Sequence, residues 1–182
     1  MLVEDGIGTG RKAGVDSANR LQVSARQNVR GYYKCKEGDF YTIIAVDAGP
    51  VAAEYTLYFK NDHSSKPFII SAIQSYATDA DVVWKLHDVT GTSDGTAIVP
   101  VNTNLASGKI AEATCRGGAA GVTGLTSTKV IAQWYNGAVN STVRQDINDR
   151  IHIGPGHAIA IEYDAGTGGA ALLMLTGYYD ED

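Results

Sequence analysis

The chain has 182 residues, of which 44% are hydrophobic and 19% charged, and its formal net charge is -5. This length fits one domain, or one domain with an appendage, that can fold without a disulfide framework or a structural metal. The acidic balance and the lack of a basic run argue against nucleic acid as a partner. No stretch approaches the roughly 20 apolar residues of a membrane-spanning helix, so we expect no membrane partner.

The two cysteines, Cys35 and Cys115, lie far apart in the sequence. Two such residues do not make a disulfide framework, so we expect free, partly buried thiols in a protein made in the cytosol. An acidic pair at positions 4–5 stands where a signal peptide would have a basic segment followed by an apolar run. We therefore expect no secretory signal.

Residues 1–30 are polar and rich in glycine, and they hold little that a core could bury. The segment GIGTGRK, residues 6–12, lacks both the preceding strand and the spacing of a phosphate-binding loop. Its glycines instead allow a flat backbone that can lie along another surface; these are Gly6, Gly8, Gly10 and Gly14. We predict an N-terminal assembly arm over residues 1–30 and a β-sandwich domain over residues 31–182.

The folded domain reads as strands separated by turns. Alternation is clearest in residues 81–91, where Val82, Trp84 and Leu86 share one side and predict a half-buried strand with Trp84 in the core. The other expected strands are residues 39–46, 53–61, 67–77, 96–102, 142–153, 157–165 and a last one near the C-terminus. Residues 129–136 suit a strand or a short helix, and the glycine-rich residues 103–128 suit a long loop of the kind that forms interfaces.

About ten such strands, with no convincing helical period between them, define the expected fold class. It is all-β: an antiparallel β-sandwich, with jelly-roll connectivity as the first choice and an extended N-terminal arm.

The histidines do not form a metal-binding pattern. His152 and His157 flank a Gly-Pro-Gly turn that is similar to part of a cupin metal site, but no His-x-His pair with a downstream glutamate precedes them. We expect His157 to lie in a turn or at a strand edge, and His63 and His87 to be isolated. The sequence therefore predicts no metal site and no cofactor.

Carboxylates for glycoside hydrolysis are available, but they lie mostly at strand ends and turns, where aspartate bonds its own backbone. The sequence alone pairs no two of them; they are Asp79, Asp81, Asp88, Asp94, Asp146, Asp149, Glu162 and Asp164. A Gly-x-Ser-x-Gly nucleophile motif is also missing. Because no catalytic set is complete, we expect no enzymatic activity.

Adjacent aromatic residues are the candidates for exposed contacts. On a strand, neighbouring side chains point to opposite faces, so one ring of each pair should face outward. The candidate aromatic contact residues are Trp134, Tyr135, Tyr178 and Tyr179. Exposed rings of this kind suit an interface with a protein or with a carbohydrate.

The opening VEDGIGTGRKAGVDSANRLQVSA resembles the start of many tailed-bacteriophage virion proteins, in which an Asp-Gly-Thr-Gly segment leads to Val-Asp-Ser, Asn-Arg-Leu and a strand. The matching positions are Asp5, Gly6, Gly8, Thr9, Gly10, Lys12, Ala13, Val15, Asp16, Ser17, Asn19, Arg20 and Leu21. Ile7 stands where the pattern more often has threonine. Further along, YTLYFKND, FIISAI, VVWKLHDVTGT and GPGHAIAIEYDAGTGG are similar to the β-sandwich of the same group.

This resemblance implies a structural protein of the virion, made in the host bacterial cytoplasm: a capsid decoration or cement protein, forming a homotrimer. Its expected partners are the major capsid protein or other virion proteins and neighbouring copies of itself. We expect the arm to be the main contact, through Gly6, Gly8, Thr9, Gly10, Arg11, Lys12, Val15, Asp16, Arg20, Leu21 and Val23, and residues 103–128 to be the second. Three alternatives stay open: a tail, baseplate or fibre-attachment component, a host-glycan-binding module, and a cupin-like or glycoside-cleaving enzyme.

Overall fold

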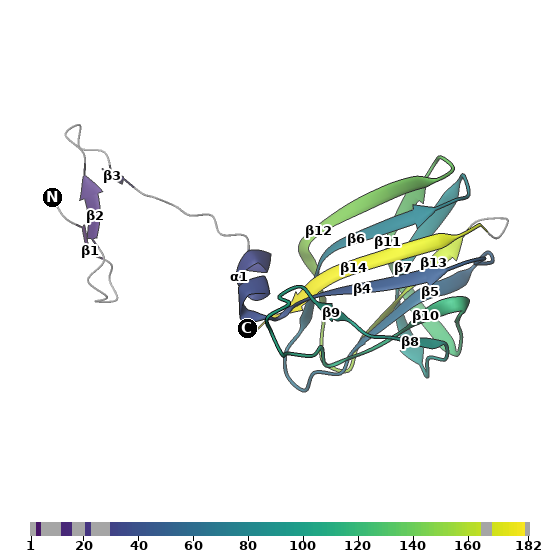
Figure 1. Ribbon diagram of the computed structural model, residues 1–182, viewed down its shortest axis with the longest axis horizontal. Coiled ribbons are helices and arrows are strands. Elements are labelled where there is room, and N and C mark those ends of the chain that lie inside the picture. The colour runs from purple at the N-terminus through teal and green to yellow at the C-terminus, as the bar shows by residue number, and fades with distance from the viewer. Residues whose placement is uncertain (1–2, 5–11, 16–20, 23–29, 165–168, 181–182) are drawn as a thin grey trace.

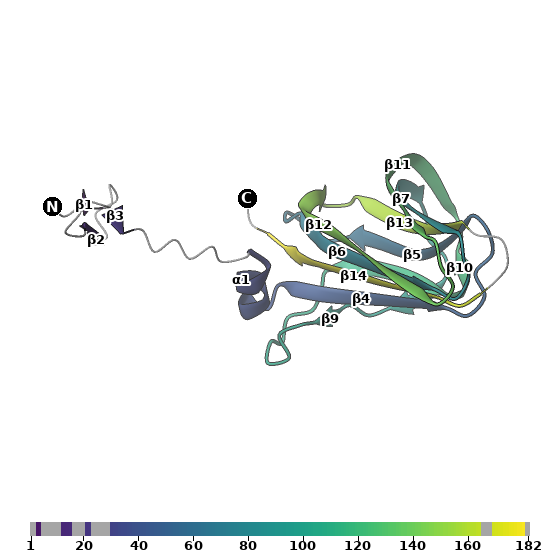
Figure 2. The same cartoon turned by 90° about the horizontal axis from the view of Figure 1, so that it is seen from above.

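The chain folds into a two-layered β-sandwich, preceded by one short helix and a small separate sheet (Figures 1 and 2). The computed structural model describes residues 3–4, 12–15, 21–22, 30–164 and 169–180, with side chains from residue 31 onward except at positions 119–120. All strand pairs are antiparallel, and the two larger sheets pack against each other. The predicted all-β antiparallel sandwich is therefore confirmed.

The first layer is a six-stranded sheet in the order β11-β7-β13-β5-β10-β8. Its strands are β5 (Glu54–Asn61), β7 (Val82–Gly91), β8 (Thr96–Ile98), β10 (Ala113–Val122), β11 (Leu125–Asn136) and β13 (Ala158–Asp164).

The second layer is a five-stranded sheet in the order β12-β6-β14-β4-β9. Its strands are β4 (Phe40–Asp47), β6 (Phe68–Ala77), β9 (Val101–Asn102), β12 (Ser141–Ile153) and β14 (Ala171–Tyr179). From β4 to β7, and again from β11 to β14, successive strands alternate between the two layers. Strands distant in sequence are therefore neighbours in space, as β4 and β14 are.

The core fills the space between the two layers with large apolar side chains. Trp84 is fully buried, as predicted, and its ring stacks on that of Trp134 with centroids 6.5 Å apart. The rings of Phe59 and Phe68 meet across the layers at 4.5 Å. Each buried side chain of this size contributes on the order of 1.5–3 kcal/mol, so the core dominates the stability of the sandwich.

Most predicted strands lie within two residues of their observed positions, and residues 129–136 belong to a strand. The expected strand over residues 96–102 is divided between β8 in one sheet and β9 in the other. Pro100 stands between them. Because proline has no backbone N–H to donate to a ladder, pairing ends there and the chain changes layer.

The prediction of one long loop over residues 103–128 is wrong, because this range contains β10 and the start of β11. The glycines that favoured a loop instead allow close packing within a strand. A Cβ at Gly117 would lie 2.8 Å from the Ile98 side chain and 2.9 Å from the Thr56 carbonyl. Gly121, with a φ of 64°, lies where the pairing of β10 with β5 changes register.

One short helix, α1 (Arg30–Glu37), leads directly into β4 and was not predicted from the sequence. It packs on the end of the five-stranded sheet, where a Cβ at Gly31 would lie 3.1 Å from the ring of Phe40. Eight residues are too few to show a helical period, so packing rather than pattern holds this helix. Across the described part of the chain, helices fall short of the length and apolarity that crossing a membrane requires.

The arm contains three very short strands, β1 (Val3–Glu4), β2 (Lys12–Val15) and β3 (Leu21–Gln22). They form an antiparallel sheet in the order β1-β2-β3, in which Glu4 pairs with Lys12 and Val15 with Leu21. In both views this sheet lies apart from the sandwich (Figures 1 and 2). A sheet of two- to four-residue strands has too little area to be stable alone.

Candidate functional site

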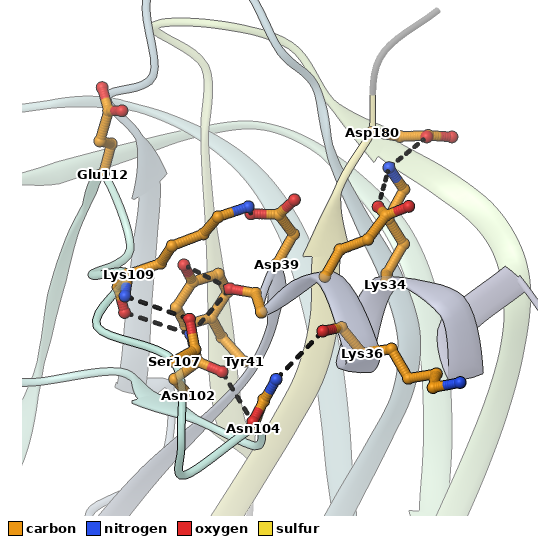
Figure 3. A network of polar contacts seen from close by, with 12 residues as sticks. Lys34, Lys36, Asp39, Tyr41, Asn102, Asn104, Ser107, Lys109, Glu112 and Asp180 are labelled. Carbon is orange, nitrogen blue, oxygen red and sulfur yellow. Dashed lines mark hydrogen bonds and ion pairs between the residues drawn. The ribbon is translucent and has the colours of Figure 1, made fainter.

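The end of the sandwich where α1 enters β4 is held by a network of polar contacts (Figure 3). Lys109 forms an ion pair with Asp39 at 2.8 Å. The Asn102 side-chain amide donates to the Gly38 carbonyl at 2.7 Å and to the Lys109 carbonyl at 3.1 Å. The Asn104 amide donates to the Lys36 carbonyl at 3.1 Å. Together these contacts tie residues 102–109 to the C-terminal end of α1.

A second set of contacts ties α1 to the C-terminal strand. Lys34 lies 3.0 Å from Glu37 and 3.4 Å from Asp180, which follows β14. Burial lowers the pKa of Lys34, but its hydrogen bonds and charge interactions with Glu37 and Asp180 outweigh burial and raise it. The lysine therefore stays charged, and the helix is fixed on both sides.

This fixed end presents large apolar side chains to the outside. Leu105 is 90% exposed, Ile110 is 79% exposed and Val99 is 76% exposed. Tyr32 and Tyr33 of α1 are also exposed. Scattered exposed apolar residues are ordinary, whereas contiguous groups of them are typical of surfaces for protein contact. Residues 103–112, the part of the expected loop that precedes β10, supply two of these side chains.

Two hollows lie at the same end. One, of about 300 Å³, is polar and mixed in charge; it is lined by Asp39, Tyr41, His63, Lys66, Lys109, Ile110, Glu112 and Tyr179. The other, of about 360 Å³, is apolar and is lined by Gly31, Tyr32, Cys35, Phe40, Ser71 and Thr103. His63 Nδ1 accepts from the backbone N–H groups of Ser65 and Lys66, so its imidazole serves to fix a turn.

The predicted arm contacts fall mostly outside the described residues. Those outside are Gly6, Gly8, Thr9, Gly10, Arg11, Asp16, Arg20 and Val23. The backbone is described at Lys12 and Val15 in β2 and at Leu21 in β3. Their role as contacts stays a prediction.

One candidate aromatic pair follows the expected alternation. Tyr135 is 54% exposed, and its hydroxyl donates to Asp81. Trp134 is buried, so the prediction that it forms an exposed contact is wrong. Its indole N–H donates to Ser75 Oγ at 2.9 Å, and the same hydroxyl donates to Asn136 Oδ1 at 3.3 Å. Trp134 thus links the two layers from inside the core.

Both residues of the other pair are buried, so the prediction of an exposed Tyr178 or Tyr179 is wrong. Tyr179 packs into the core, where its ring centroid lies 5.2 Å from that of Phe68. Tyr178 pairs with Phe40 on the neighbouring strand, and their rings stack at 6.0 Å. Because α1 covers Phe40, the outer face of the sheet is closed at this point.

A cluster that sequence reasoning did not find lies on the outer face of the six-stranded sheet. Lys85 contacts Glu162 at 2.9 Å and Asp164 at 2.6 Å. His87 Nδ1 lies 2.8 Å from Ser127 Oγ, and His87 Nε2 lies 3.2 Å from a Glu162 oxygen. The available signal was the alternation of residues 81–91, which puts Lys85 and His87 on the side of the strand opposite Trp84. Pairing of β7 with β13 then brings in the two carboxylates.

Burial lowers the pKa of His87; the nearby Glu162 opposes this shift and Lys85 adds to it. The imidazole is therefore neutral at neutral pH; its Nδ1 is within hydrogen-bonding distance of Ser127 on β11, and its Nε2 lies beside Glu162 on β13 without a hydrogen bond. The pockets described above do not include these residues. The cluster is best understood as a polar tie between three strands of one sheet.

The remaining candidates are dispersed over the molecule. His152 and His157 line one groove of about 300 Å³ together with Asp88. Within the described residues, no group of three or more histidine, cysteine, aspartate or glutamate side chains is arranged to hold a metal ion. Cys35 and Cys115 are both free, as expected, and burial raises the pKa of the Cys115 thiol to about 12.

Comparisons of the chain with protein-family models, with curated proteins and with solved structures found no match.

Proposed function

We propose that the chain is a non-enzymatic structural protein of a tailed-bacteriophage particle, a capsid decoration or cement protein that docks through its N-terminal arm. The observation that carries the proposal is the arm itself. It forms a sheet of two- to four-residue strands apart from the sandwich, and it leaves the molecule at the end where Leu105 and Ile110 are exposed. Such a segment becomes stable only against another protein surface. The resemblance of the arm sequence to virion proteins supports the same role.

We also infer a jelly-roll connectivity for the sandwich. The order β12-β6-β14-β4 in one layer and β11-β7-β13-β5 in the other supports it, because chain neighbours fall into opposite layers as two Greek keys require. Strands β8, β9 and β10 are then an excursion between β7 and β11. The exposed Val99, Leu105 and Ile110 all belong to this excursion or its loops.

In this proposal the partners are the capsid lattice, through the major capsid protein, and neighbouring copies in a trimer. Exchange of arms between identical subunits closes a symmetric oligomer without a large apolar interface. Many copies on a lattice then gain avidity from individually modest contacts.

The first test is the copy number of the chain in purified particles, measured by quantitative mass spectrometry against the major capsid subunit. A ratio near one, or near a simple fraction of one, supports a lattice-covering protein. A ratio of a few per cent moves the chain to the tail, baseplate or fibres. Absence from particles overturns the virion role.

Deletion of residues 2–24 tests the arm directly. We expect the truncated chain to keep the circular dichroism and thermal transition of a folded sandwich, because the described core residues lie between Tyr41 and Tyr179. We expect it to lose incorporation into particles. Normal occupancy of the truncated chain would contradict the proposal.

A glycan-binding role has less support than the sequence suggested. Of the four candidate aromatic contacts, Trp134, Tyr178 and Tyr179 are buried, and only Tyr135 is exposed. One exposed ring from this set is a small platform for stacking a sugar; the other exposed rings, Tyr32 and Tyr33, lie on α1.

A further inference from the structure

The five-stranded sheet ends on one side at β12, and this edge is interrupted. Pairing of β12 with β6 shifts between Asp146 and Ile151, which inserts extra residues into β12. Asn148 and Asp149 there have positive φ angles of 52° and 60°. Bulges and charged side chains are the devices by which natural sheets prevent further strands from pairing. The β12 edge therefore carries its own protection.

On its other side the sheet ends with β9, which pairs only with Tyr41 and Thr42 of β4. From Ile43 to Asp47, the described strands pair with β4 on one side alone, through β14, in unbroken register. We call these five residues the open edge. Ile44 is 47% exposed and Val46 is 58% exposed, and no charged side chain occurs from Ile43 to Val46.

The six-stranded sheet has no comparable edge among its described strands. β8 is three residues long. β11 shifts register twice against β7, between Ser127 and Lys129 and between Val130 and Ala132. An apolar, regular and unpaired stretch of sheet is a template for one more strand, and the open edge is where this molecule presents one.

The distribution of charge along the chain indicates which segment could pair with the open edge. Residues 1–30 hold five lysines or arginines and three acidic residues, a net charge of +2. Residues 31–182 hold ten lysines or arginines and seventeen acidic residues, a net charge of -7. The arm of one copy is therefore attracted to the sandwich of another. Within the arm, the segment LQVSA, residues 21–25, alternates apolar and polar residues and is flanked by Arg20 and Arg26.

We propose that residues 20–26 of a second copy pair with the open edge of β4 as an added strand. β3 is already the outer strand of the arm sheet, so the β1-β2-β3 sheet would continue the five-stranded sheet of the neighbour. In the structure, β3 lies away from the open edge of its own chain, which leaves that edge to a second copy (Figure 1). This inference rests on the proposed role of the arm in assembly and names the surface it uses.

The test is a disulfide between copies. Two differently tagged chains, both carrying Cys35→Ser, are produced together, one with Val23→Cys and one with Val46→Cys. After mild oxidation we expect a covalent heterodimer on a non-reducing gel. The matched control pairs Val23→Cys with Thr142→Cys, an exposed position on the protected β12 edge, and should give no heterodimer.

A single chain with both Val23→Cys and Val46→Cys tests for pairing within one copy. A cross-linked monomer, with no heterodimer in the mixed experiment, overturns the proposal. If no cross-link forms although deletion of residues 2–24 abolishes assembly, this surface is wrong and the proposed function stands. If the heterodimer forms but the chain is absent from particles, the surface is right and the proposed function fails.

Discussion

The two edges of the five-stranded sheet differ in how readily a further strand could pair with them. β12 breaks its register and places Asn148 and Asp149 in left-handed conformations, so it offers no regular ladder to an incoming strand. β4 keeps a regular ladder and exposes Ile44 and Val46 beside it. In the proposed assembly, such a sheet accepts a further strand at β4 and not at β12.

The protected side also rests on a polar cluster inside the core. Trp134 at the β11 edge donates to Ser75 on β6, and Asn136 accepts from the same serine. The Asn136 amide in turn donates to the Ser141 carbonyl at the start of β12 at 2.9 Å. These bonds hold β11, β12 and β6 together from within, whereas the open edge of β4 has β14 as its described neighbour in the sheet.

The largest expected effect is on assembly. Val46→Lys places a charge on the open edge, where it would oppose an apolar strand from a second copy, and we expect loss of the oligomer measured by analytical ultracentrifugation. Val46 is already more than half exposed, so the free energy of unfolding should change by no more than about 0.5 kcal/mol. Thr142→Lys on β12 is the matched control and should assemble normally.

The second largest expected effect is a loss of stability when the core beside the β12 edge is changed. Trp134→Ala removes a buried indole and leaves the Ser75 hydroxyl without its donor, so we expect a loss of about 3–5 kcal/mol in denaturant unfolding. Tyr135→Ala, one residue away and exposed, should cost far less. Equal losses for the two variants would mean that Trp134 does not anchor this side.

A smaller effect tests the bulge in β12. Asn148→Val puts a β-branched residue at a φ of 52°, and we expect a cost of about 1–2 kcal/mol. Asn148→Gly accepts the same φ without a steric cost and should be close to neutral. If valine is tolerated as well as glycine, the left-handed conformation does not hold the bulge in place.

The smallest effect is a dependence on pH at the six-stranded sheet. Burial lowers the pKa of His87 below its usual 6.5, so below about pH 6.5 the unfolded chain binds a proton that the folded chain does not. Stability should therefore fall as the pH drops, by at most about 1.4 kcal/mol per pH unit from this group. His87→Gln should flatten the unfolding free energy between pH 7 and pH 5, and an unchanged slope would show that other groups cause it.

Much of the sandwich could be predicted from sequence because its strands alternate strongly. β7 was readable from Val82, Trp84 and Leu86 alone, which are all buried. β10 could not be predicted, since its Gly-Gly-Ala-Ala-Gly stretch has no alternation, and the need for a glycine at Gly117 is apparent only once Ile98 and the Thr56 carbonyl are in place. α1 was missed because eight residues carry too little pattern.

The candidate site was predictable only in part. The arm could be recognised because it has few apolar residues that a core could bury. Residues 103–128 could be recognised by their glycine content, and their first part, residues 103–112, contains the exposed Leu105 and Ile110. The open edge could not be found in the sequence, because it exists only where a two-residue β9 stops short along β4. The burial of Tyr178 likewise depends on α1 lying over a neighbouring strand, which no local pattern reports.

The pairing of β4 with β14 has a consequence for synthesis of the protein. The first strand of the sandwich takes its neighbour from the last one, with Phe40 opposite Tyr178 and Asp47 opposite Ala171. A chain still on the ribosome holds β4 without that neighbour until residues 171–179 have emerged, so the sheet closes late and through long-range contacts. The surface proposed to receive an arm is therefore complete only once residues 171–179 have been synthesised, and products that end before β14 should lack it.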